Sequence, residues 1–253
     1  NAISALDSPS GGRPGEFFGT ELELGSGFPL SDVLMFKVEA PELSFNEKPP
    51  RYYWRGRAYD FFSNDQWYTT GTTREEYSPT DPLPGIDDTN AVTFNFNTGE
   101  QRVSLLYAPS QPVWVSRPGS MLTAPGGDQM DIVSWNATPS ILPGETYQVE
   151  AALNNPTIEE LRAAGTEYPK WVTDKYLQLP ENFSQPIRSL ALEITANAET
   201  PYDQAFAITQ YLRTNIKYSP TIPTAPRGTD RLEWILFEHK QAYCVYYASA
   251  EIL

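Results

Sequence analysis

The sequence predicts an α+β protein in which an antiparallel β-sandwich or barrel-like domain precedes a helical region. Short β-prone runs separated by Pro and Gly recur from Asp32 to Ala152, among them VLMFKVEA, AVTFNFN, RVSLLYA, DIVSW and TYQVEAAL. After Asn155 the apolar residues recur with a period of about 3.6, which is typical of amphipathic helices. The 253 residues are enough for a sizeable core and for two domains.

These patterns divide the chain into three segments. Residues 1–30 are rich in Gly, Pro and Ser and are expected to form a loose lead-in. Residues 31–155 are the expected β-rich domain, and residues 156–253 are the expected helical region. The boundary falls at the run NNP, where turn-forming residues meet the change of period.

A hairpin turn is expected at Ser63–Gln66 inside the β-rich domain. Its residues SNDQ lie between two aromatic runs, and Asn and Asp tolerate the left-handed backbone that tight hairpin turns require. We expect the neighbouring rings to be core and cross-strand partners rather than a sugar-binding platform; they are Trp54, Tyr59, Phe61 and Trp67.

The helical region contains clear start signals. Thr157 and Glu160 have the spacing of a capping box, and Pro201 after Thr200 suits the first position of a helix. The segments PKWVTDKYL and QPIRSLALEITA are further expected helices, and Asp230 can cap RLEWILFEH. One face of the helix after Thr200 is expected to be core and carries Ala205, Ile208, Leu212 and Ile216.

Charge and composition exclude several classes of function. The net charge is −14, from 18 basic and 32 acidic side chains, so the surface would repel nucleic acids and anionic lipid headgroups. No run of 18 apolar residues suggests a membrane span. No zinc, nucleotide or nucleophile-elbow motif is present, so neither a cofactor nor a metal is expected. The acidic loops are expected to be solvated turns rather than calcium sites; they contain Asp81, Asp87, Asp88, Asp128 and Asp131.

Cys244 is the only cysteine, and a helix-like run begins at it. Unpaired N–H groups and the dipole at a helix N-terminus favour a thiolate over a thiol, which is the form that acts as a nucleophile. The small residues Ala248, Ser249 and Ala250 would let the helix pack closely. The alternative is that Cys244 is a small buried hydrophobic residue.

The segment WILFEHKQAYCVYYASA, Trp234–Ala250, resembles the nucleophile segment of the transglutaminase-like superfamily. The hydrophobic pair is Leu236 and Phe237, Cys244 is the nucleophile, and Tyr247, Ala248 and Ala250 match the small-residue helix. Ala242 stands where the family usually has glycine, so a strained or altered loop is expected there. The segment Tyr53–Tyr68 is similar to a phrase found in extracytoplasmic domains of bacterial membrane-anchored members.

The resemblance implies that residues 156–253 are the helical first half of a papain-like thiol domain. Cys244 would form a thioester from a glutamine or peptide carbonyl, which an amine or water would resolve. The Cys244 N–H would support the oxyanion together with Tyr218, unless the Tyr218 ring is merely packed. The histidine and aspartate of such a site would follow Leu253, so residues 1–253 are expected to be inactive; His239, five residues before the thiol, is expected to be a solvated surface residue.

The resemblance also implies a parent protein anchored by membrane segments outside this sequence and acting on the periplasmic or exterior side. Its substrates would be polypeptides or peptides of the cell envelope. The residues at both ends, Asn1 with Ala2 and the uncapped run Glu251–Leu253, predict a piece of a longer protein. The competing classes are a non-catalytic binding or structural envelope module on a degenerate scaffold, and an assembly interface.

Overall fold

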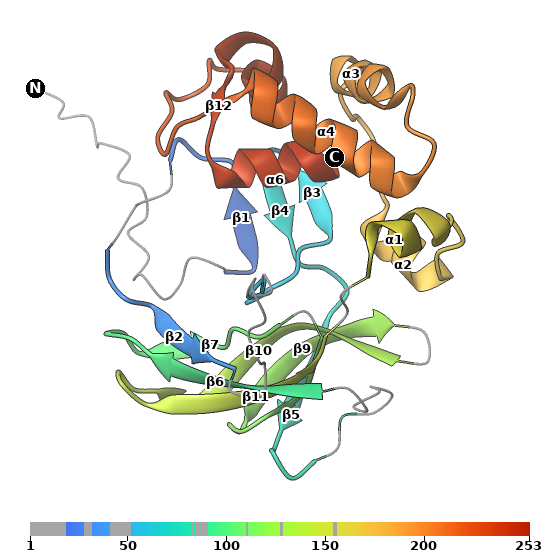
Figure 1. Ribbon diagram of the computed structural model, residues 1–253. Coiled ribbons are helices and arrows are strands. Elements are labelled where there is room, and N and C mark those ends of the chain that lie inside the picture. The colour runs from blue at the N-terminus through green and yellow to red at the C-terminus, as the bar shows by residue number, and fades with distance from the viewer. Residues whose placement is uncertain are drawn as a thin grey trace, which may run out of the picture.

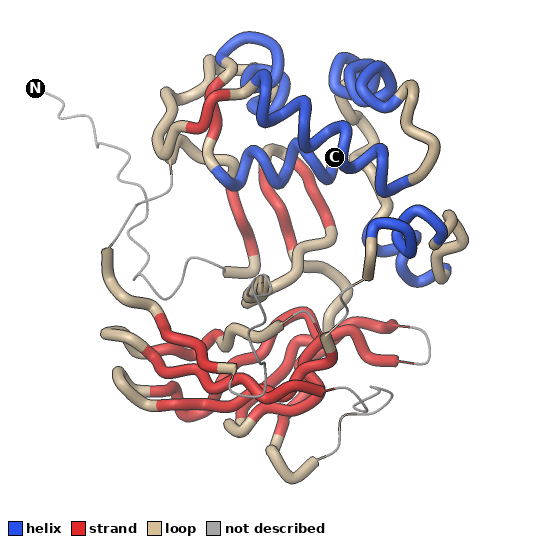
Figure 2. The backbone as a smooth tube through the Cα atoms, viewed as in Figure 1, coloured by secondary structure: helices blue, strands red, loops and turns tan. Residues whose placement is uncertain are grey.

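The computed structural model describes residues 19–27, 32–40, 52–81, 83, 91–109, 111–126, 129–153 and 156–253. Two four-stranded sheets occupy one end of the molecule, and six helices gather at the other end around a three-stranded sheet (Figures 1 and 2). The strands within each of these three sheets are antiparallel. The predicted α+β class is confirmed.

The two four-stranded sheets form what we call the double-sheet region. The first has the order β5 (Thr73–Tyr77), β9 (Gly119–Gly126), β10 (Gln129–Ile141) and β7 (Val103–Leu105). The second has the order β2 (Phe36–Glu39), β6 (Ala91–Thr98), β11 (Thr146–Ala152) and β8 (Gln111–Val115). Buried and more exposed residues alternate along β11, because successive side chains of a strand point to opposite faces.

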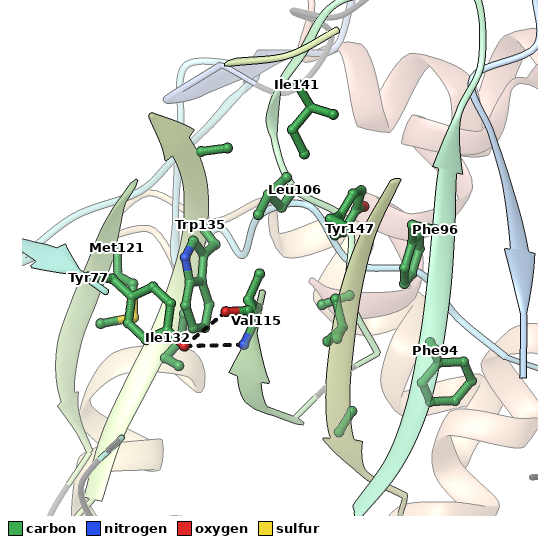
Figure 3. Close-up of a cluster of buried hydrophobic side chains, with 14 residues drawn as sticks. Tyr77, Phe94, Phe96, Leu106, Val115, Met121, Ile132, Trp135, Ile141 and Tyr147 are labelled. Atoms are coloured by element: carbon green, nitrogen blue, oxygen red, sulfur yellow. Dashed lines mark hydrogen bonds between the residues drawn. The ribbon is translucent and has the colours of Figure 1, made fainter. Parts of the chain in front are cut away.

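Both sheets contribute side chains to one hydrophobic cluster (Figure 3). Phe96 on β6 is fully buried and stacks on Tyr147 of β11 with ring centroids 4.8 Å apart. Elsewhere in the cluster, a hydrogen bond joins the two sheets: the Tyr77 hydroxyl of β5 donates to the Val115 carbonyl oxygen of β8 at 3.1 Å. Trp54 makes edge contacts with the Phe96 ring at 5.2 Å, so its predicted packing role is confirmed.

The three-stranded sheet has the order β1 (Glu21–Glu23), β4 (Gln66–Tyr68) and β3 (Phe61–Ser63). Strands β3 and β4 form the predicted hairpin, whose turn residues Asn64 and Asp65 have φ angles of 51° and 61°. Strand β1 belongs to the segment expected to be a loose lead-in. Its pairing with β4 brings it beside helix α6 (Figure 1).

The helical region follows the expected order. Its elements are α1 (Ile158–Ala163), α2 (Lys170–Tyr176), α3 (Gln185–Thr195), α4 (Pro201–Asn215), β12 (Lys217–Tyr218), α5 (Arg231–Glu233), a π-helix η1 (Trp234–His239), β13 (Gln241–Ala242) and α6 (Cys244–Ile252). The predicted capping box and the caps at Thr200 and Asp230 are confirmed, since each cap side chain accepts a first-turn N–H. Of the expected α4 core face, Ala205 is exposed while Leu212 and Ile216 are buried.

The segment after Asp230 differs from the single helix that its sequence suggests. It begins as α5 and continues as the π-helix η1, and the Lys240 N–H donates to the Ile235 carbonyl five residues earlier. Lys240 then ends η1 in a left-handed conformation. Among the described residues, none of the helices has the length and apolar character needed to span a bilayer.

Candidate active site

Cys244 is the first residue of α6, and its side chain is exposed. The preceding residue, Tyr243, gives the helix no side-chain cap. The Tyr246 N–H donates to the Tyr243 carbonyl oxygen, so within the described part of the chain the N–H groups of Cys244 and Val245 are the ones that lie free beside the thiol. The predicted helix start is confirmed, and the alternative of a buried hydrophobic cysteine is wrong.

The Cys244 thiol lies in a groove of about 780 Å³, which we call the Cys244 groove. One wall is α6, a second is formed by Leu22 of β1 and Trp67 of β4, and a third by the residues that follow α2. Most of the lining is apolar, and the full set is Leu22, Arg57, Tyr59, Asp60, Trp67, Tyr176, Leu177, Gln178, Leu179, Cys244, Val245, Ala248, Ser249, Ile252 and Leu253. No lining residue is a histidine.

A buried ion pair fixes the third wall. The Asp60 side chain is 3% exposed, and one of its oxygens lies 3.3 Å from the Lys175 Nζ. The same carboxylate accepts hydrogen bonds from the Thr70 N–H and hydroxyl, and Lys175 donates to the Thr70 carbonyl oxygen. The end of α2 is thereby held against the strand that enters the β3–β4 hairpin.

Replacing Asp60 by asparagine is expected to lower the free energy of unfolding by about 2 kcal/mol, because hydrogen bonds to charged groups contribute about 1.5–3 kcal/mol. The amide keeps the volume but leaves the Lys175 ammonium without its counter-charge. Asp174→Asn removes the same charge from an exposed pair with Lys170 and should change this free energy by only about 0.5 kcal/mol or less. Urea unfolding measures both, and equal effects would contradict the role given to Asp60.

Asp131 is a second link to this wall and corrects the expectation that it lies in a solvated turn. It belongs to strand β10, and its carboxylate accepts a hydrogen bond from the Tyr176 hydroxyl. Burial, together with this carboxylate, raises the pKa of Tyr176 well above its ordinary value, so the hydroxyl stays protonated as a donor. Asp81 is exposed, and Asp87, Asp88 and Asp128 lie outside the described residues.

Two tyrosine hydroxyls fasten helix α6 to neighbouring segments of the chain. Tyr246 is 2% exposed, and its hydroxyl lies 3.1 Å from the carbonyl oxygens of both Leu24 and Gly25. The Tyr247 hydroxyl donates to the Ile216 carbonyl oxygen at the end of α4. Burial raises the pKa of Tyr243 to about 12 and also raises that of Tyr246, so these groups remain neutral near pH 7.

The loop before the thiol is built by a short parallel strand pair. Strand β13, Gln241–Ala242, pairs with β12, and the Ser219 N–H donates to the Ala242 carbonyl oxygen at 2.8 Å. Ala242 is 1% exposed and has no left-handed backbone; the left-handed residue is Lys240, with a φ of 57°. The strain expected at Ala242 is therefore wrong, because its strand conformation suits alanine.

Tyr218 is brought beside this loop by the same pairing. It lies opposite Ala242 in the register, is 57% exposed, and has its ring 6.2 Å from the ring of Tyr247. It does not line the Cys244 groove. Its support of an oxyanion stays a prediction.

His239 lies at the end of η1 and is partly buried, not fully solvated as expected. Its ring stacks on Trp234 with centroids 4.4 Å apart and an interplanar angle of 10°. Its Nε2 atom is buried and makes no hydrogen bond with the described residues. This packing places it against the core instead of in the groove beside the thiol.

Some contributors to the site are not apparent from the sequence. Trp67 is expected to pack within the β-rich domain, but its ring lines the groove and its Nε1–H donates to the Ser249 hydroxyl. For Ser249 the sequence gives only a weak indication of its role, namely that it is a polar residue in a helix of small residues. Nothing in the sequence indicates that Asp60 and Lys175 form a pair, because the pair depends on contact between distant segments of the chain.

Comparison with known proteins agrees with this geometry. A model of the transglutaminase-like superfamily matches residues 188–253. The uncharacterized protein YebA of Bacillus subtilis (strain 168) is 31% identical over 83 residues, which are 32% of this chain and 11% of YebA. The chain thus spans only a small part of that relative.

Two crystal structures of the periplasmic domain of TgpA from Pseudomonas aeruginosa share the fold. The first has a TM-score of 0.53 at 18% identity and covers 87% of this chain and 69% of the TgpA chain. The second, bound to ethylmercury, has a TM-score of 0.54 at 16% identity and covers 92% and 76%. Residues 188–253, which include the helix that begins at Cys244, are therefore a segment of the transglutaminase-like superfamily, within a fold similar to that of the TgpA periplasmic domain.

Proposed function

We propose that this chain is part of a transglutaminase-like cysteine enzyme that transfers or hydrolyses acyl groups through a thioester on Cys244. The observation that carries the proposal is the exposed sole thiol at the first position of α6, beside the Cys244 groove. The match of residues 188–253 to the superfamily supports the same reading.

In the proposed reaction the Cys244 sulfur attacks the amide carbonyl of a glutamine or peptide. The oxyanion receives hydrogen bonds from the Cys244 N–H and from the Tyr218 hydroxyl. The C–N bond then breaks, the amine leaves with a proton, and an amine or water resolves the thioester. A histidine must carry these protons and a carboxylate must orient it, and we propose that residues after Leu253 supply both.

We further propose that the protein acts outside the cytoplasm, anchored by membrane segments that this sequence does not contain. The similarity to a periplasmic domain supports this placement. The proposed substrates are polypeptides or peptides of the cell envelope, and the net charge of −14 argues against nucleic-acid partners. We propose that the double-sheet region, whose two sheets share one core, is a β-sandwich.

Labelling of the thiol tests the nucleophile. Iodoacetamide near pH 7 is expected to alkylate Cys244 at least about tenfold faster in the folded chain than in the same chain in urea, because a helix N-terminus and its N–H groups favour the thiolate. Mass spectrometry measures the rate. Since Cys244 is the sole cysteine, the unfolded chain is a matched control with the identical thiol.

Cys244→Ser should abolish the labelling altogether. If the folded and unfolded chains instead react at the same rate, Cys244 is not an activated nucleophile. That result would favour the alternative, a non-catalytic envelope module on a degenerate scaffold.

A further inference from the structure

Trp67 on strand β4 reaches helix α6 through a buried hydrogen bond. Its Nε1–H donates to the Ser249 hydroxyl oxygen at 2.7 Å, across 182 positions of sequence. Trp67 is 8% exposed and Ser249 is fully buried, so water does not compete for the Ser249 hydroxyl. The bond ties the helix that begins with Cys244 to a strand outside the matched segment 188–253.

Helix α6 depends on such anchors. Most of the stability of a helix within a protein comes from the tertiary packing of its buried face, and the buried residues of α6 are Tyr246 and Ser249. The helix also has no side-chain cap at Tyr243 to hold its first turn. The first turn is the part that matters for Cys244, because the dipole and the N–H groups act on the thiol only while that turn is helical.

The anchors and the thiol lie on different faces of α6. Tyr246 and Ser249 are three residues apart, which places them on one face, and both are buried. Cys244 and Ala248 are four residues apart, which places them on another face, and both are exposed. The helix is therefore held through Tyr246 and Ser249, while the Cys244 side chain itself stays exposed.

We propose that Trp67 is a positioning residue for Cys244. Through its hydrogen bond to Ser249 it keeps α6 folded and fixed in place against strands β1 and β4, and so keeps the thiol at an ordered helix N-terminus. The inference rests on the proposed function, in which Cys244 is the nucleophile. It assigns a role in the thiol site to the β3–β4 hairpin.

The test is the rate of Cys244 alkylation by iodoacetamide in the 253-residue chain carrying Trp67→Phe, Ser249→Ala or both. Near pH 7 each single variant is expected to react at least about fivefold more slowly than the unsubstituted chain, and the double variant no more slowly than either, because coupled partners lose the same interaction. Near pH 9 the differences should shrink, since free thiols are then largely ionised and access alone sets the rate. Ser249→Ala removes the same hydrogen bond but leaves the large Trp67 ring in place, so this variant still tests the proposal if Trp67→Phe fails to fold.

Trp54→Phe is the control, because it makes the same change at a partly buried ring that packs against the core of the double-sheet region. It should leave the alkylation rate unchanged. If Trp54→Phe slows alkylation as much as Trp67→Phe, or if both Trp67→Phe and Ser249→Ala react as fast as the unsubstituted chain, the positioning role is wrong while the nucleophile assignment stands. If the unsubstituted chain reacts no faster folded than in urea, the proposed function itself fails, and the positioning role fails with it.

Discussion

Turnover of a glutamine-containing peptide by residues 1–253 is expected to be at least about a thousandfold slower than by a longer form of the protein that supplies a histidine and an aspartate after Leu253. A thiol and its base act as one catalytic unit, so the loss of the base removes most of the rate. The described histidine, His239, stacks on Trp234 and does not line the Cys244 groove. Release of ammonia in the presence of a primary amine measures the rate.

Cys244→Ala is the control for both forms. It should abolish the turnover of the longer form and leave the low background of residues 1–253 unchanged. Turnover by residues 1–253 that disappears in both Cys244→Ala and His239→Ala would show that the base is already present, and would overturn the assignment of the proton-transfer partners.

Phe96→Ala is expected to lower the free energy of unfolding by about 3–5 kcal/mol, the range found when a buried aromatic side chain is replaced by alanine. The Phe96 ring is fully buried and stacks on the Tyr147 ring (Figure 3). It also contacts the rings of Phe36 and Trp54. Truncation would leave a cavity between the two sheets of the double-sheet region. Denaturant unfolding measures the loss.

Phe206→Ala makes the same change on the exposed side of α4, where the side chain is 52% exposed. Its effect on the free energy of unfolding should be about 1 kcal/mol or less. Equal losses for the two substitutions would show that Phe96 does not occupy the centre of the core.

The features that could be predicted from the sequence depend on neighbouring residues. The capping box at Thr157, the turn at Asn64 and Asp65, and the helix start at Cys244 each follow from side chains within a few positions of one another. The match of residues 188–253 to the superfamily was predictable for the same reason, since the residues that carry the resemblance surround Cys244.

The features that could not be predicted depend on distant contacts. The bond from Trp67 to Ser249 and the pair of Asp60 with Lys175 join segments that no local pattern connects. The altered backbone expected at Ala242 does not occur, because Ala242 pairs with β12 as part of β13, and the left-handed residue is Lys240. Period and propensity contain no information about such pairing.

Because β1 and the β3–β4 hairpin lie with the helices, the segments that form the helical end of the molecule alternate along the chain with those that form the double-sheet region. The chain passes from the helical end to the double-sheet region after Glu23, returns after Glu39, leaves again after Tyr68 and returns for good after Ala152. A cut near residue 155 would leave all the strands of the double-sheet region on one piece, but it would separate β1, β3 and β4 from the helices that gather around them. Helix α6 follows all of these strands in the chain, so during synthesis it can pack on β1 and β4 only after the whole double-sheet region has been made.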